Sequence, residues 1–103
     1  MRGGTGQTWR RKSTIPKKFQ LYQNYPNPFN PTTTIKYDVP MQSRVKIVVY
    51  DLLAREVATL VDETKIAGSY QAVWNANQLA SGVYFYRLEA GTFQETKKLL
   101  LLR

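Results

Sequence analysis

Residues 25–37 read YPNPFNPTTTIKY, a proline-rich bend that leads directly into an alternating strand pattern. Each proline fixes φ at about −65° and removes a backbone donor, and each residue before a proline is pushed toward extended geometry. Helix is therefore excluded over the bend, and its asparagines favour Asx turns. We expect the rings of Tyr25 and Phe29 to close one end of a core. The residues expected to hold the bend are Pro26, Asn27, Pro28, Phe29, Asn30 and Pro31.

Beyond the bend, apolar residues recur at every second position, as in half-buried strands. Ile35 and Tyr37, for example, alternate with Lys36 and Asp38. Short segments of this kind, separated by turn signals and without helical periodicity, predict an all-β protein, an Ig-like antiparallel β-sandwich of about seven strands. The predicted strands are 19–22, 33–39, 44–51, 56–61, 69–75, 83–90 and 93–102, with a polar loop over 62–68 and room for a helical turn at 52–55 or 77–79.

Trp74 is predicted to lie at the centre of the core, because an indole buries a large area. Leu79 is expected to fold under the sandwich as a plug, and Gly68 to make a turn. The other predicted core residues are Ile35, Tyr37, Val45, Ile47, Tyr70, Tyr84 and Leu88.

The net charge of +8 is unevenly distributed along the 103 residues. Six of the fifteen basic residues fall in 1–18, which contain no acidic residue, whereas 19–103 are nearly balanced. Residues 1–18, rich in Gly, Thr, Lys and Arg, have the composition of a flexible linker or arm, and 19–103 fit one small domain. Six basic residues with little aromatic content are a weak indication of nucleic-acid binding. A nucleic-acid partner is therefore not expected.

The residue types that carry most enzymatic chemistry are missing. The chain has neither histidine nor cysteine, which excludes Ser–His and Cys–His catalysis. It also has no glycine-rich phosphate loop. Asp51, Asp62 and Glu63 could form a loose calcium site, but their spacing matches no dedicated calcium loop. We therefore expect no enzymatic activity, no metal and no cofactor.

Several motifs occur together, in a fixed order, across residues 19–103. They are YPNPFNPTTTIKYDVP (25–40), VKIVVYD (45–51), REVATLV (55–61), GSY (68–70), Trp74, LASGVYFYRL (79–88) and ETKKLLLLR (95–103). This set resembles the C-terminal sorting domain, type A, of proteins exported by the bacterial type IX secretion system. The Ig-like domain of flagellar hook-capping proteins is similar, but less so. Related domains usually have glycine where this chain has Ala54, and alanine would be strained there if φ is positive.

The resemblance implies a sorting signal that carries an N-terminal cargo to the outer-membrane translocon. The destination is the cell surface or the medium, reached through the periplasm of a Gram-negative bacterium. It also implies a surface sortase that removes the domain, and we expect cleavage in the mobile segment before Phe19. The residues that the resemblance assigns to translocon recognition are Gly82, Tyr84, Arg87, Lys97, Lys98 and Arg103.

The end of the chain leaves other functions open. Residues 99–102 place leucine on both faces of one strand, so one face must be covered or exposed. An exposed apolar edge can pair with another chain. An alternative is therefore a structural Ig-like subunit of an extracellular fibre or surface assembly, joined by exchange of the N-terminal arm or the last strand. A third possibility, carbohydrate binding through exposed Tyr and Trp, rests on composition alone.

Overall fold

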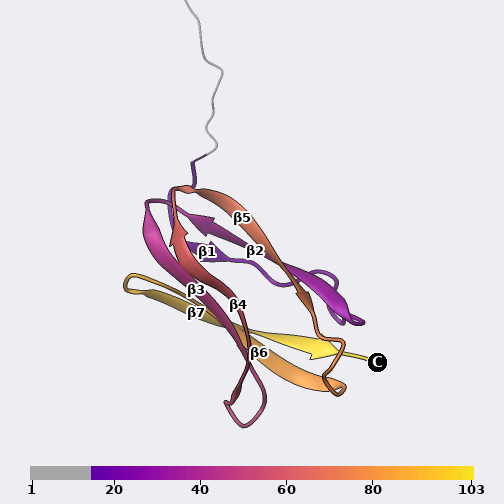
Figure 1. The fold of residues 1–103 in the computed structure, drawn as a ribbon. Coiled ribbons are helices and arrows are strands. Elements are labelled where there is room, and N and C mark those ends of the chain that lie inside the picture. The colour runs from indigo at the N-terminus through magenta and orange to yellow at the C-terminus, as the bar shows by residue number, and fades with distance from the viewer. Residues whose placement is uncertain (1–14) are drawn as a thin grey trace, which may run out of the picture.

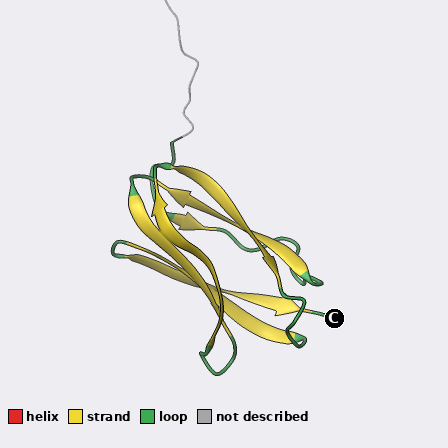
Figure 2. Ribbon diagram, in the orientation of Figure 1, coloured by secondary structure: helices red, strands yellow, loops and turns green. Residues whose placement is uncertain are grey.

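Our computed structural model describes residues 15–103, which form seven antiparallel strands and no helix (Figures 1 and 2). No helix in this part of the chain is long and apolar enough to cross a membrane. The arm predicted over 1–18 lies largely outside the described residues. The strands are β1 (Gln20–Leu21), β2 (Thr32–Val39), β3 (Ser43–Tyr50), β4 (Glu56–Lys65), β5 (Gly68–Asn75), β6 (Gly82–Ala90) and β7 (Phe93–Leu101).

Two sheets pack face to face, as Figure 1 shows, and confirm the predicted sandwich. One has the strand order β1-β2-β5 and the other β4-β3-β6-β7. The alternation in sequence decides which side chains enter the space between them. Ile35 and Tyr37 of β2 face Val45 and Ile47 of β3 across the core, and each is at most 1% exposed. Burial of these side chains, in both sheets, provides the main stabilisation of the fold.

Phe29 is 2% exposed and closes one end of the core, as predicted. Its ring centroid lies 5.7 Å from that of Trp74, whose ring also packs edge-on against Tyr84 at 6.1 Å. Trp74 is therefore buried, but it lies near the end of β5, toward one end of the sandwich and not at its centre. Leu79 packs against the same cluster, as expected.

Other expectations from the sequence are also wrong. Tyr25 does not plug the core, because hydrogen bonds to β2 turn its ring outward and leave it 81% exposed. Tyr70 is only partly buried, stacked on Tyr37 at the rim of the core. The loop predicted over 62–68 is shorter, because β4 stays paired with β3 as far as Lys65. Neither of the possible helical turns, at 52–55 or 77–79, forms.

Ala54 has a positive φ, which is the condition under which alanine is strained at this position. Its φ is 63°, inside the left-handed region that favours glycine. The conformation is imposed by the β3–β4 turn, where Ala54 donates its N–H to the carbonyl of Asp51. The turn is therefore formed at the cost of strain in one alanine.

Candidate recognition surface

The proline-rich bend covers the open edge of the last strand. The backbone N–H of Phe29 donates to the carbonyl of Leu100, and Leu102 N–H donates back to the carbonyl of Phe29, both at 3.0 Å. Asn27 Oδ1 accepts from Leu100 N–H at 3.0 Å, and Gln23 Nε2 donates to the carbonyl of Lys98 at 2.7 Å. The C-terminal half of β7 therefore has its backbone groups occupied by the chain's own bend.

Buried hydrogen bonds fix the bend in turn. Asn24 is 2% exposed, and its side chain donates to the carbonyl of Pro26 and to Thr33 Oγ1. Asn24 N–H donates to the Tyr86 hydroxyl at 2.8 Å, which itself donates to the carbonyl of Tyr22 at 2.8 Å. Burial raises the pKa of Tyr86 to about 12. One phenol oxygen thus ties the bend to the middle of β6.

The outer face of β6 and β7 is not covered by any described element. Register places side chains of both strands on this face, and they are partly buried or, as for Lys98, exposed. We call this surface the hairpin face, made of Val83, Phe85, Arg87, Lys98 and Leu100. Leu99 and Leu101, by contrast, point inward and are 0% exposed. The alternation of leucines in the last strand thus puts one set in the core and leaves Leu100 on the surface.

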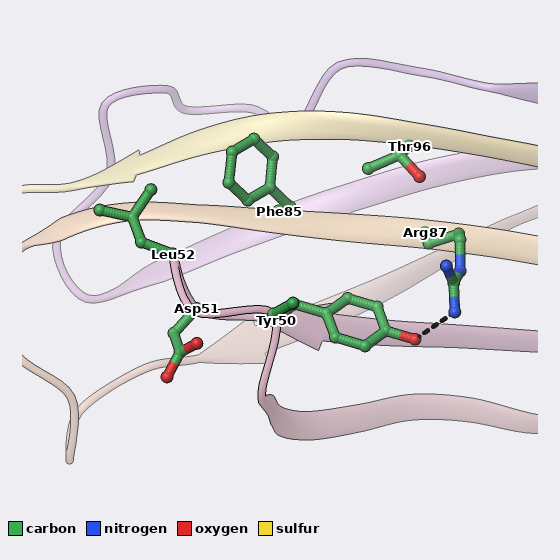
Figure 3. A pocket seen from close by; sticks show the side chains of 7 residues that line it. Tyr50, Asp51, Leu52, Phe85, Arg87 and Thr96 are labelled. Atoms are coloured by element: carbon green, nitrogen blue, oxygen red, sulfur yellow. Dashed lines mark hydrogen bonds between the residues drawn. The ribbon is translucent and has the colours of Figure 1, made fainter.

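The largest hollow on this face has a volume of about 360 Å³ (Figure 3). Figure 3 shows the Arg87 side chain extending from β6 toward the hydroxyl of Tyr50 on β3, with Phe85 further along β6. Arg87 Nη2 donates to the Tyr50 hydroxyl at 2.6 Å, and its guanidinium carbon lies 4.9 Å from the centre of the Tyr50 ring. The hollow is lined by Tyr50, Asp51, Leu52, Ala54, Phe85, Arg87 and Thr96.

One N–H group of Arg87, that of Nε, makes no hydrogen bond within residues 15–103. Its Nε lies 2.8 Å from Oε2 of Glu89, close enough for an ion pair. The same nitrogen is buried and has no hydrogen-bond partner, so its N–H is not directed at that carboxylate. The contact with Glu89 is thus ionic and not a well-formed hydrogen bond.

Two further hollows continue along β6 and β7. One, of about 250 Å³, lies between the bend and the strands and is lined by Asn27, Pro28, Val83 and Lys98, with Leu99 and Leu100. The other, of about 190 Å³, includes Gly82 and Tyr84 beside the β3–β4 turn. Gly82 has a φ of 156°, and a Cβ there would meet no atom within 4 Å. Of the six residues assigned to recognition, four therefore line these three hollows.

The remaining two residues, Lys97 and Arg103, do not lie on the hairpin face. Lys97 sits on the inward-facing side of β7, at the rim, 3.3 Å from the carboxylate of Glu95. Arg103 Nη1 donates to the carbonyls of Asn77 at 2.6 Å and Leu79 at 2.8 Å. Lys97 is thus ion-paired at the rim of the sandwich, whereas Arg103 is exposed and holds the β5–β6 loop through these hydrogen bonds. Tyr84 is 8% exposed and packs mainly in the core.

The carboxylates considered for calcium lie in separate ion pairs. These are Asp51–Arg55 at 2.8 Å, Asp62–Arg44 at 2.7 Å and Glu63–Lys65 at 2.5 Å. A hydrogen bond from the backbone N–H of Arg55 lowers the pKa of Asp51. Within residues 15–103, no group of three or more His, Cys, Asp or Glu side chains comes together to hold a metal ion.

Sequence reasoning missed Tyr50, Leu52 and Thr96 as parts of the surface. Alternation alone places Tyr50 on the outer side of its strand and Phe85 on the outer side of another. Their proximity depends on register across β3, β6 and β7, in which Tyr50 pairs with Phe85 and Arg87 pairs with Thr96. The only sequence signal for this part of the surface was an aromatic residue at an outward position in each of two strands, Tyr50 in β3 and Phe85 in β6.

Residues 23–102 match the family model described as secretion system C-terminal sorting domain. No curated protein sequence matches the chain. A solved structure of PorZ, described as an essential bacterial surface component of the type-IX secretion system of Porphyromonas gingivalis, has a similar fold, with a TM-score of 0.56 and 20% identity. The similarity covers 82% of this chain and 11% of that chain. Because the family model spans most of its length, the chain belongs to the secretion system C-terminal sorting domains, which direct the proteins that carry them through the type IX secretion system to the cell surface or medium.

Proposed function

We propose that the chain is a non-catalytic sorting signal. The outer-membrane secretion machinery recognises it through the hairpin face together with the basic C-terminal end. The observation that supports this most is that Arg87 and Lys98 each line a hollow on the hairpin face, and that Gly82 lines a third hollow beside the β3–β4 turn. The face combines partly buried apolar side chains with cations, the composition of a protein-binding surface.

The two ends of the domain are placed so that a cargo at one end would not cover the other, as a sorting signal requires. Phe19 stacks on Phe93, at the start of β7, with ring centroids 5.3 Å apart. The basic end follows Leu101, eight residues along the same strand, which corresponds to about 27 Å. Figure 1 shows the two ends of the described chain at different ends of the sandwich. A cargo joined before residue 19 would therefore leave the C-terminal end open to the machinery.

The arrangement also supports a division of the chain into a linker, 1–18, and a sorting domain, 19–103. Lys17 and Lys18 precede the first strand and are exposed. A surface sortase would find an accessible backbone here, whereas cuts within the strands would require unfolding. We do not assign a nucleic-acid partner, because the folded part is nearly balanced in charge.

The alternative of a fibre subunit requires strand exchange with a second copy. Exchange through the end of β7 would first have to displace the bend, including Phe29 from the core and its two backbone hydrogen bonds to β7. The occupied edge therefore favours the sorting function over polymerisation through this strand.

Charge reversal of a single exposed residue tests the proposed surface. The full chain is fused behind a periplasm-directed fluorescent protein in a bacterium with a type IX system, and the exported fraction is measured. Lys98→Glu should lower export severalfold while leaving the melting temperature unchanged, because surface substitutions usually shift stability by less than about 0.5 kcal/mol. Reversal of Arg103 is unsuitable, because this side chain holds the β5–β6 loop.

The matched control is Lys18→Glu, which makes the same charge change ahead of the first strand. Export of the control should equal that of the unmodified fusion. Equal export of the Lys98→Glu and Lys18→Glu fusions would contradict the proposal that the secretion machinery recognises the hairpin face.

A further inference from the structure

The opposite side of the sandwich carries a second feature, independent of the hairpin face. On the outer face of the three-stranded sheet, register brings together a row of Tyr25, Thr34 and Val73 and a row of Tyr22, Lys36 and Gln71. We call this surface the tyrosine face. Tyr25 is 81% and Val73 61% exposed, so no described element covers it.

The exposed ring of Tyr25 is carried by a rigid backbone. Tyr25 N–H donates to the carbonyl of Thr34, and Thr34 N–H donates back, both at 3.0 Å. The preceding residue, Asn24, is buried and fully engaged, and the next, Pro26, has a fixed φ. Binding to this ring therefore requires little ordering of the protein, which favours affinity.

A hollow of about 320 Å³ lies beside the ring, and most of the residues that line it carry polar side chains. It is lined by Gln23, Tyr25, Thr34, Lys36 and Gln71, so that Tyr25 supplies the only aromatic or aliphatic side chain among them. Gln23 uses its amide N–H groups on Asn24 Oδ1 and the Lys98 carbonyl, which leaves its Oε1 as an acceptor. The hot spots of protein interfaces are centred on well-packed aromatic and Arg side chains, whereas four of the five residues that line this hollow are Gln, Thr or Lys.

These groups match the chemistry of a sugar. A pyranose ring has a face of C–H groups, which the negative face of an aromatic ring attracts, and a rim of hydroxyls that amides and hydroxyls bind. The charge of the hollow indicates which kind of sugar it would bind. Lys36 has no ion-pair partner among residues 15–103, and Asp38, the nearest acid along β2, already accepts hydrogen bonds from Tyr22 and Ser69. An acidic substituent would complement the free ammonium group.

We propose that the tyrosine face binds an acidic polysaccharide. A sugar ring stacks on Tyr25, its hydroxyls bond to the amides and Thr34, and a carboxylate or phosphate on the chain lies against Lys36. This function is separate from export, because it uses the sheet on the other side of the sandwich from the hairpin face.

The test is a titration of the ¹⁵N-labelled full chain with oligogalacturonate, compared with its methyl ester, which has the same backbone without charge. The amide signals of Thr34 and Gln71 should shift with the acidic oligomer and less with the ester. Tyr25→Ala should weaken binding about fivefold to tenfold, and Lys36→Gln about threefold. The control Lys46→Gln, which removes one charge from the other sheet, should bind like the unmodified chain.

Because the chain is basic, a polyanion can also bind through charge alone. In that case Tyr25→Ala would bind as well as the unmodified chain and Thr34 and Gln71 would not shift, which would overturn the proposal. Equal affinity for the acid and its methyl ester would overturn the assignment of Lys36 to an acidic group. Tyr25 is exposed, so its substitution should leave the fold intact, and an unchanged melting temperature verifies this.

Discussion

Replacing Tyr86 by phenylalanine removes one oxygen atom that two backbone groups share. Asn24 N–H donates to this oxygen, and the hydroxyl donates to the carbonyl of Tyr22, both at 2.8 Å. Tyr86 itself is 0% exposed and Asn24 2% exposed. The loss should therefore detach the proline-rich bend from β6 without changing the shape of the core.

The size of the effect follows from the two groups left behind. A buried backbone group without a partner costs about 1–3 kcal/mol. Asn24 N–H is out of reach of water, whereas Tyr22 is partly exposed and its carbonyl can be hydrated. We expect a loss of about 2–4 kcal/mol in the free energy of unfolding, a large part of the stability of a small domain. The melting temperature should fall by about 15 °C.

Urea unfolding of the full chain, followed by far-UV circular dichroism, measures this loss. Tyr84→Phe is the matched control, because it removes the same atom two residues away on the same face of β6. The Tyr84 hydroxyl donates only to the carbonyl of Ala80, an exposed residue, so we expect a loss below about 1 kcal/mol. Equal losses in the two variants would refute the argument that the bend depends on Tyr86.

The remaining predictions concern pH, the core and one turn. The pKa of Tyr86 is about 12 in the folded chain, against 10.0 ordinarily, so its contribution to stability is complete below pH 10 and is lost between pH 10 and 12. The unmodified chain should therefore lose up to about 1.4 kcal/mol per pH unit more than Tyr86→Phe over that range in urea titrations. Trp74→Ala should cost about 3–5 kcal/mol, because it empties the space between Phe29 and Tyr84, and a melt within a few degrees of the unmodified chain would contradict this. Ala54→Gly should raise the melting temperature by about 4 °C, since relief of a φ of 63° outweighs the added chain entropy, and a lower melting temperature would contradict this.

Much of the fold could be predicted because alternation and burial coincide in the central strands. Ile35 and Tyr37 in β2, and Val45 and Ile47 in β3, are inward-facing by sequence and buried in the structure. Such a pattern is reliable where one face of a strand packs on a core and the other meets solvent. The predicted strand 33–39 accordingly differs from β2 by a single residue.

Prediction failed where neither face of a segment is clearly apolar. The second half of β4, from Asp62 to Lys65, is polar because it is an edge strand, yet its backbone pairs with β3. Tyr25 and Phe29 have similar rings, and composition cannot show which one points inward. Hydrogen bonds to different strands decide this, Tyr25 to β2 and Phe29 to the end of β7.

The candidate surface could be predicted only in part. Alternation places Arg87 and Phe85 on the same side of β6, but the approach of Tyr50 depends on pairing between strands far apart in sequence. The role of Arg103 depends on carbonyls of the β5–β6 loop, more than twenty residues earlier. Contacts of this kind follow from the assembled sheets and have no local pattern in sequence.

The most direct test of the central claim is export of the unmodified fusion, with the fluorescent protein ahead of the full chain. Export is compared between a bacterium with an intact type IX system and the same strain without it, and the periplasm, cell surface and medium are measured separately. If the chain is the sorting signal, fluorescence reaches the surface or medium only in the intact strain and stays in the periplasm of the other. Retention in the periplasm of both strains, for a fusion whose sorting domain is shown to be folded, would contradict the account.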